Sequence, residues 1–313
     1  MRARDLAFQN GPVKLGGTGI LPDGEGPHPL VVMMHGSGPL DRDENMPGQA
    51  LNIFNALAAS LADAGHATFR YDKRGCGAST GDYLTHGFAD LIGDAVAVVA
   101  GLRAMPDFPS VYLLGHSEGT ALAPQVAAQA GGIAGLILIC PYIQDGRAML
   151  MAQAGQMARM FRDMRGPKGW VIRSVLWARG GVERQQARTI DGLLATTNPV
   201  MKVGGKDADA RSLRDFLRSD NRAIHAANRL PTLLIAAEKD IQCDAADALA
   251  IAALNPAAAV ISLPDMTHVL RRKPGAHSFA DYPDLIAGPV DPQVGSEIAA
   301  WLCRQAERSE PGG

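Results

Sequence analysis

Short runs of apolar residues alternate with longer segments of helical periodicity over most of the chain. Helical periodicity spans 47–64, 88–103, a segment ending near 130, 245–254 and 292–304. The six predicted strands are apolar throughout, at residues 29–34, 66–71, 111–114, 133–140, 230–236 and 258–263. Strands that are apolar on both faces are typical of a parallel sheet covered by helices on both sides. The pattern therefore predicts an α/β fold.

Two regions depart from this alternation. Residues 6–21 carry short apolar stretches that predict an N-terminal antiparallel hairpin, with turn chemistry at Pro22-Asp23-Gly24. Residues 142–228 are largely helical in character and contain no run of the core-strand type. We predict that residues 142–228 form a helical cap, inserted into a core made of residues 1–141 and 229–313.

The predicted cap also differs from the core in charge. Residues 142–229 hold 16 Lys and Arg against 8 Asp and Glu, whereas the whole chain has a net charge of −2. The net charge of the whole chain gives no reason to expect nucleic-acid binding. The excess of positive charge in the cap suggests that the cap favours anionic acyl substrates or docks on the acidic core. Methionines gather in the same region, either as ordinary helix core or as the wall of an adaptable apolar pocket: Met149, Met151, Met157, Met160 and Met164.

The composition indicates in which compartment the protein is located and whether it holds a cofactor. No run of about 18 apolar residues predicts a membrane span, and the N-terminus lacks the apolar segment of a secretory signal. Four scattered cysteines without a Cys-x-x-Cys pair favour reduced thiols over a zinc site or a disulfide framework. We therefore expect a cytoplasmic protein without a metal or another cofactor.

The candidate nucleophile lies where one of these strands meets a helix. The strand 111–114 runs into Gly115-His116-Ser117-Glu118-Gly119 and then into an Ala-rich helical segment. This fits G-x-S-x-G in the strand–turn–helix context of a nucleophile elbow, which lifts the serine hydroxyl above the sheet at a helix N-terminus. Side chains at 115 or 119 would collide with the neighbouring strand and helix, which explains both glycines. We predict Ser117 as the nucleophile.

A serine hydroxyl needs a base, and the base needs a carboxylate that orients it. In elbow enzymes these follow the serine in the order acid, then histidine. His268 follows the last core strand and is our predicted base, because His116 sits inside the elbow and cannot fold back on its neighbour. Asp240 follows the strand after the cap and is the predicted acid. Loop register leaves Glu238 and Asp244 as alternatives, while Asp265 is expected to be a turn residue.

Two backbone N–H groups must stabilise the oxyanion. The first is expected from Glu118, directly after the nucleophile, and the second from the loop His35-Gly36-Ser37-Gly38-Pro39 after the first central strand. We place the second donor at Ser37, with Gly38 as the alternative; a glycine turn without a catalytic part is the remaining interpretation of this loop.

The side chain of Glu118 poses a separate question, because a carboxylate beside the nucleophile opposes the developing negative charge. The sequence favours a solvated acid in the first helical turn, where the helix dipole suits it. Pairing with Lys73 or Arg74 is the alternative. Asp72 and Arg74 are expected to pin their glycine-rich loop rather than to act in catalysis.

Several other chemistries lack their motifs. The glycine-rich stretch 72–81 does not fit a P-loop, no G-x-G-x-x-G lies on a first strand-to-helix turn, and His-Glu-x-x-His is missing. An aspartate nucleophile is excluded because position 117 is serine.

Taken together, these motifs resemble the α/β-hydrolase superfamily over nearly the whole chain. More narrowly, the chain is similar to bacterial serine esterases with three motifs, seen here at His35 to Asp43, Tyr71 to Ser79 and Gly115 to Gly119. The resemblance implies a triad of Ser117, Asp240 and His268, an α/β-hydrolase fold with a mostly parallel sheet, and no cofactor. Relatives of this type also include serine aminopeptidases and acyl-peptide hydrolases.

We predict a carboxylesterase that cleaves small or medium acyl esters through an acyl-enzyme. A serine aminopeptidase, amidase or thioesterase on the same triad is the first alternative, and a non-catalytic ligand receptor on this fold is the second. The expected partner is a small-molecule ester. Chain length, alcohol preference and oligomeric state stay open, a homodimer included.

Overall fold

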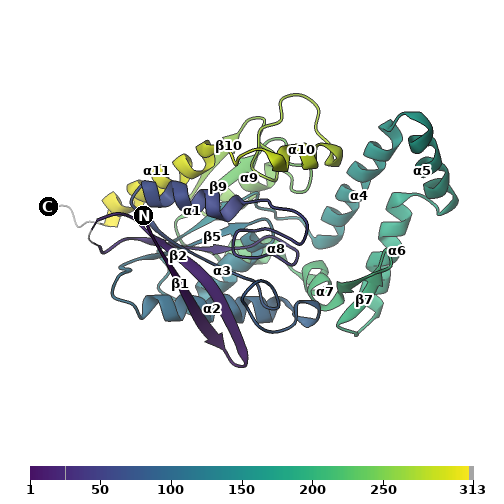
Figure 1. Cartoon of the computed structure of the whole chain (residues 1–313). Helices are drawn as coiled ribbons and strands as arrows, with labels where there is room; N and C mark the ends of the chain where they lie inside the picture. Colours follow the sequence, from purple (N-terminus) through teal and green to yellow (C-terminus); the bar gives the residue numbers. More distant parts are fainter. Residues whose placement is uncertain (25, 310–313) are drawn as a thin grey trace.

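The computed structural model describes residues 1–24 and 26–309 and contains one large twisted sheet (Figure 1). Its strand order is β1-β2-β4-β3-β5-β6-β9-β10, antiparallel at β1–β2 and β2–β4 and parallel from β4 onward. The strands span β1 Arg2–Asn10, β2 Val13–Leu21, β3 Leu30–Met34, β4 Ala67–Tyr71, β5 Val111–His116, β6 Gly135–Ile139, β9 Thr232–Ala237 and β10 Ala258–Leu263. The predicted α/β class is confirmed.

Helices cover both faces of this sheet, and the alternation of side chains along each strand divides the core in two. Helices α2 (Phe88–Arg103) and α3 (Gly119–Ala130) pack on the face that receives Val32. Helices α1 (Ile53–Asp63) and α11 (Pro292–Ser309) pack on the opposite face, as Figure 1 shows. Helix α9 (Ala246–Ala252) joins the first layer.

The N-terminal hairpin is present, but its predicted turn is wrong. Asn10 pairs with Val13, so Gly11 and Pro12 form a two-residue loop. Gly11 has φ +57°, and hairpin turns of this length require a positive φ at the first central position. Pro22-Asp23-Gly24 instead follows the end of the second strand.

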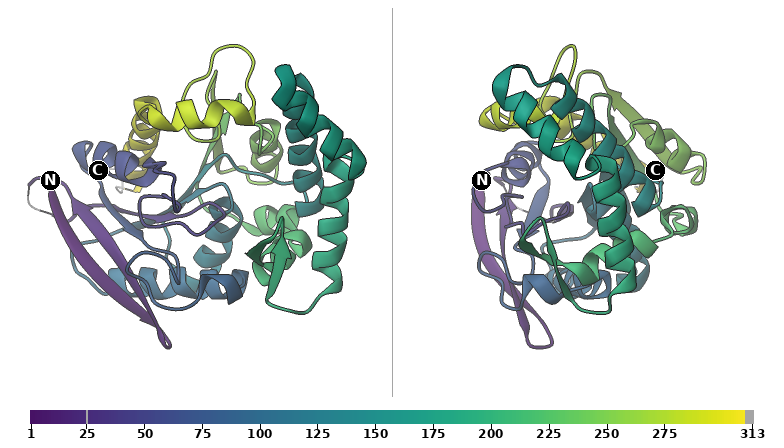
Figure 2. Two further views of the ribbon diagram at one scale, coloured as in Figure 1. Left: turned by 45° about the vertical axis from the view of Figure 1, so that its right-hand side comes forward. Right: turned by 90° about the vertical axis from the view of Figure 1, so that its right-hand side faces the viewer.

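Residues between β6 and β9 form a separate group of elements at one end of the sheet (Figures 1 and 2). Two short antiparallel strands also occur there, β7 Val200–Val203 and β8 Lys206–Asp209, and the sequence did not predict them. The helices are α4 Gly146–Asp163, α5 Gly166–Ala178, α6 Val182–Ala195, α7 Ala210–Arg218 and α8 Asn221–Ala227. Because β6 and β9 are hydrogen-bonded neighbours, this segment leaves and re-enters the sheet at adjacent strands.

The loop after β10 carries a short helix, α10 (Tyr282–Ala287), that the sequence did not predict. In Figure 1 this helix lies toward the same end of the sheet as the elements between β6 and β9. Within residues 1–24 and 26–309, no helix is both long and apolar enough to cross a bilayer.

Candidate active site

Ser117 lies at the apex of a sharp turn between β5 and α3, as the elbow motif predicts. Its φ is +53°, a left-handed conformation that non-glycine residues adopt rarely and at a cost in strain. A Cβ on Gly115 would lie 2.3 Å from the carbonyl oxygen of Gly119, and one on Gly119 would lie 2.3 Å from that of Met34. Both glycines are therefore required for the close approach of strand and helix.

His268 and Asp240 meet beside this turn. His268 Nδ1 is 2.7 Å from Asp240 Oδ2, and the other carboxylate oxygen accepts the N–H groups of Gln242 and Cys243 at 2.7 and 3.0 Å. Burial favours the neutral acid, but His268 and these backbone donors outweigh it and lower the pKa of Asp240. An ionised Asp240 holds the proton on His268 Nδ1, which leaves Nε2 free to act as a base.

The alternative acids point elsewhere. Glu238 accepts a hydrogen bond from Ser262 Oγ at the surface, 2.7 Å away, and Asp244 accepts the N–H of Ala246 at 3.0 Å. Asp265 has φ +57° and lies in the turn after β10, in agreement with its predicted role. Of the acids weighed from the sequence, Asp240 alone is hydrogen-bonded to His268 in the described residues.

The two predicted oxyanion donors, Ser37 and Glu118, line one cavity together with Ser117. In the described part of the chain, the backbone N–H groups of Ser37 and Glu118 have no hydrogen-bond acceptor, whereas Gly36 N–H already donates to Glu44 at 2.7 Å. Ser37 lines both cavities that border Ser117, and Gly38 lines neither. This placement favours Ser37 over Gly38, and both donors remain predictions.

Glu118 is buried, so the interpretation as a solvated acid is wrong. The residue is only 8 % exposed, and its Oε1 lies 3.1 Å from Lys73 Nζ. The lysine also donates to the carbonyl oxygen of Gly36 at 2.6 Å. Glu118 lines a cavity together with Tyr142, which precedes the inserted helices, and Phe216 of α7. The predicted alternative, neutralisation by Lys73, is the observed one.

The neighbouring charged residues pin their loop, as predicted. Asp72 accepts hydrogen bonds from Arg42 and from the backbone N–H of Ala78. Arg74 pairs with Asp94 at 2.7 Å and does not reach Glu118.

Comparison with known proteins places this geometry in a family. The family model for serine aminopeptidases of family S33 matches residues 27–271. The chain belongs to this family of α/β hydrolases. Among curated relatives, esterase EstD of Thermotoga maritima is 26 % identical over 96 % of this chain and 67 % of its own length.

Solved structures agree with this S33 hydrolase in fold. Est1E of Butyrivibrio proteoclasticus, in a structure with bound ferulic acid, superposes with a TM-score of 0.64 at 16 % identity, covering 96 % of this chain and 99 % of its own. The Pyrococcus furiosus esterase Pf2001 superposes with a TM-score of 0.60 at 16 % identity, over 97 % and 91 % of the two chains. At this level of identity the match shows the fold alone.

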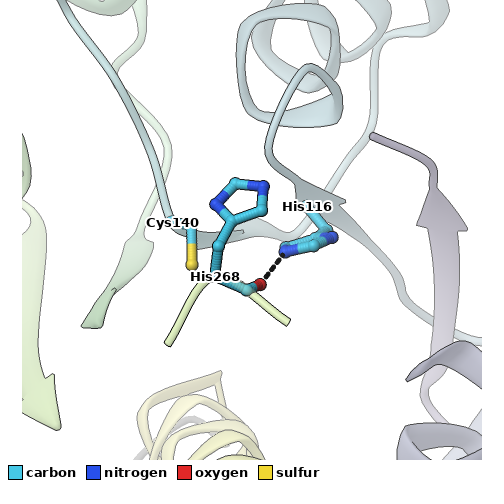
Figure 3. Close-up of side chains that lie close together, drawn as sticks. All are labelled: His116, Cys140 and His268. Carbon is cyan, nitrogen blue, oxygen red and sulfur yellow. Dashed lines mark hydrogen bonds between the residues drawn. The ribbon is translucent and has the colours of Figure 1, made fainter. Parts of the chain in front are cut away.

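The hydrolase also contains a buried pair that the sequence did not reveal. His116 Nδ1 lies 2.9 and 3.0 Å from the two carboxylate oxygens of Glu44, and His116 Nε2 lies 3.0 Å from the backbone oxygen of His268 (Figure 3). Glu44 belongs to a run of polar loop residues whose pattern is typical of a solvated loop, so no local signal distinguished it.

Two cavities border Ser117 in this S33 fold. One, of about 110 Å³, lies on the side of His268 and is also lined by Leu51 and Tyr282. The other, of about 100 Å³, lies under the inserted helices, and Met149 lines it. Met157 is exposed, so Met149 fits the predicted pocket wall and Met157 does not.

Two groups of side chains in the site have potential ligand atoms close enough together to hold a metal ion, and both groups include His268. One joins it to His116 and Cys140 (Figure 3), the other to Asp240 and Cys243. Burial raises the pKa of both thiols well above the usual value, and His116 Nε2 and the carboxylate of Asp240 already take part in the hydrogen bonds described above. Both groups therefore coincide with residues that already form the hydrogen bonds of the site.

Proposed function

We propose that this S33-family hydrolase is a serine carboxylesterase with Ser117 as nucleophile, His268 as base and Asp240 as orienting acid. The observation that carries the proposal is the Asp240–His268 hydrogen bond beside a strained elbow serine, in a site with two unengaged backbone N–H groups. The curated relative named as an esterase supports the choice of ester substrates.

The reaction follows from this geometry. His268 Nε2 accepts the proton of the Ser117 hydroxyl while Oγ attacks the acyl carbonyl, and the carbonyl electron pair moves onto its oxygen. The N–H groups of Ser37 and Glu118 donate to that oxyanion. The oxyanion collapses, the C–O bond to the alcohol breaks, and His268 returns the proton to the alkoxide. Water then repeats the sequence on the acyl-enzyme, releasing the acid and regenerating Ser117.

Esters are favoured over peptides with a free terminus because the cavities beside Ser117 offer no unpaired charge. Their two carboxylates belong to Glu44 and Glu118, and each already has a cationic partner. No Lys or Arg lines either cavity among the described residues. The cationic insertion therefore gives no support to a preference for anionic acyl groups, although Arg211 does pair with Asp90 of the core at 3.1 Å.

The decisive test compares p-nitrophenyl acetate with aminoacyl p-nitroanilides as substrates. We expect faster turnover of the ester, and Ser117→Ala should abolish it. Faster turnover of the anilides would refute the ester proposal in favour of a peptidase. Failure of a fluorophosphonate probe to label Ser117 would favour the alternative of a non-catalytic receptor.

We further propose that residues 142–228 act as a cap over the site and that the protein is cytoplasmic. The cap is supported by Met149 and Phe216, which lie in the wall of a cavity that contains Ser117. The location is supported by four free cysteines, as expected in a reducing compartment. Fractionation of the source cells would test the location, and a panel of ester chain lengths would measure the cavity.

A further inference from the structure

Both ring nitrogens of His116 face groups that can only accept hydrogen bonds. Nδ1 faces the carboxylate of Glu44, and Nε2 faces the backbone oxygen of His268 (Figure 3). Two acceptors require a proton on each nitrogen, so the ring is an imidazolium. Burial favours the neutral ring, but the charge of Glu44 outweighs it and raises the pKa of His116. A buried ion pair therefore lies directly behind the nucleophile.

Glu44 connects this pair to the loop that carries Ser37. Its Oε1 accepts the N–H of Gly36 at 2.7 Å, so the residue before the predicted oxyanion donor is fixed by the same carboxylate. Glu44 is 1 % exposed and holds φ +65°, a strained conformation that needs support from surrounding contacts. Three segments far apart in the sequence thus meet at one carboxylate–imidazolium pair.

We propose that Glu44 and His116 are positioning residues that align the oxyanion loop and the main chain of His268 with Ser117. Asp240 orients the imidazole of His268, and His116 fixes the backbone from which that imidazole projects. The inference rests on the proposed function, since a receptor would need no such alignment. Misplacement of catalytic groups by about 1 Å costs about 100-fold in rate.

The test uses Glu44→Gln and Glu44→Ala in the full chain, assayed with p-nitrophenyl acetate. We expect kcat to fall about 10- to 100-fold with KM within threefold of wild type, because the alignment of the catalytic groups is lost while the other residues that line the cavity are retained. Added formate should restore part of kcat in Glu44→Ala by filling the vacated carboxylate position. Glu238→Ala is the matched control, since Glu238 contacts Ser262 outside the site. The kcat of this variant should stay within twofold of that of the wild type.

A kcat within twofold of wild type in both Glu44 variants would overturn the proposal. The proposal would also be overturned if kcat and the folded fraction fell in parallel in both variants and formate did not restore kcat, because Glu44 would then have a structural role only. Failure of the proposed function is separate: it would appear as an inactive wild type or an active Ser117→Ala.

A second, independent observation concerns α5 at the outer end of the insertion (Figures 1 and 2). Trp170 and Trp177 on this helix are 66 % and 84 % exposed, and Val171 and Val175 beside them are exposed as well. Trp170, Val171 and Trp177 fall on one side of a helix together with Ser174, and Val175 lies at the edge of that side. Trp301, the third tryptophan of the chain, is buried. The helix α5 therefore presents an apolar, aromatic face to solvent, which we call the α5 face.

The surroundings of the α5 face are strongly cationic. Residues 159–188 hold eight Lys and Arg against two acidic residues. None of the eight forms an ion pair within the part of the chain that the structure describes. Two copies that met through their α5 faces would bring these cations together, which opposes a symmetric dimer through this surface.

We infer that the α5 face docks on an anionic lipid bilayer. Tryptophan is the side chain most suited to the membrane interface, and Lys and Arg around an apolar helix face are attracted to anionic headgroups. Each basic residue near such a surface contributes about a fivefold gain in binding. The complementarity of charge selects this partner over a neutral or cationic surface.

Co-sedimentation with vesicles tests this docking surface. We expect at least about tenfold stronger binding to phosphatidylcholine vesicles that contain about one third phosphatidylglycerol than to phosphatidylcholine alone. Trp170→Ser with Trp177→Ser should weaken this binding at least about tenfold. Leu249→Ser is the control, because Leu249 is equally exposed but lies on α9 of the core.

Lack of binding by the wild type, or equal binding by the double variant, would overturn the inference. Light scattering supplies the other refuting result: a concentration-dependent dimer that disappears in the double variant would assign the α5 face to a second copy of the chain.

Discussion

The ion pair between Lys73 and Glu118 predicts a large and specific loss of stability when one partner is removed. In Lys73→Met the carboxylate of Glu118 stays buried without a cation, and the backbone oxygen of Gly36 loses its donor. Removing one partner of a buried pair costs about 3–5 kcal/mol, because the remaining charge is uncompensated. We therefore expect Lys73→Met to lower the free energy of unfolding by about 3–5 kcal/mol.

Burial is what sets this magnitude. The side chains of Lys73 and Glu118 are 4 % and 10 % exposed, with 3.1 Å between Nζ and Oε1. The pair of Lys202 and Asp207 is a matched comparison at 2.8 Å, but its side chains are 68 % and 52 % exposed. Because water screens the surface pair, Lys202→Met should cost less than about 1 kcal/mol.

Urea unfolding followed by intrinsic fluorescence measures both variants, together with the double variant Lys73→Met, Glu118→Met. Replacing both charges removes the uncompensated carboxylate, so the double variant should recover at least about 2 kcal/mol relative to Lys73→Met. The reasoning is refuted if Lys73→Met costs no more than Lys202→Met, or if the double variant is as unstable as the single one.

Three further predictions concern the site. Asp240→Asn should lower kcat by about 10⁴-fold with little change in KM, because His268 loses the partner that orients its tautomer; steady-state kinetics measures it, and a loss below tenfold contradicts the triad. The pKa of His116 is raised from its ordinary value of 6.5, and that of Glu44 is lowered from 4.5, so their pair should stabilise the fold fully between pH 4.5 and 6.5. This stabilisation should be lost as pH rises from 6.5 through the raised pKa of His116. It should also be lost as pH falls from 4.5 through the lowered pKa of Glu44. Urea unfolding of wild type and Glu44→Gln across pH measures this, and a pH-independent difference contradicts it. Phe216→Ala should shift the preferred ester to longer acyl chains by opening the cavity under the inserted helices, as a chain-length panel will show; an unchanged profile would mean that the acyl group lies in the other cavity.

The core elements were predictable because their signals are local. A strand buried on both faces has to be apolar throughout, and a helix on its face has to be apolar at every third or fourth position. Helix α2 therefore begins and ends where the sequence places it, at Phe88 and Arg103. Strand β10 also has its predicted bounds, Ala258 and Leu263, although as the edge strand it is only partly buried. The hairpin turn was misplaced because both Gly11-Pro12 and Asp23-Gly24 carry turn chemistry, and pairing between the strands selects one of them.

The small elements of the insertion and of the loop after β10 carried weaker signals. Strands β7 and β8 have four residues each and are largely half-buried or exposed, so they have no apolar run to reveal them. Helix α10 has six residues, too few for helical periodicity to stand out.

The elbow serine, its histidine and its acid could be predicted from the chain because each follows a core strand, in the order that the fold imposes. The environment of Glu118 and the pairing of His116 with Glu44 could not, because they join residues 45 and 72 positions apart. Whether a carboxylate is solvated or buried depends on what folds around it. Glu118 borders a cavity under the inserted helices, and Glu44 borders a cavity that also contains residues of the loop after β10. The linear pattern thus predicted a nucleophile and its partners, whereas only the folded chain shows which charges neutralise one another around them, since burial and long-range proximity leave no periodic trace in the sequence.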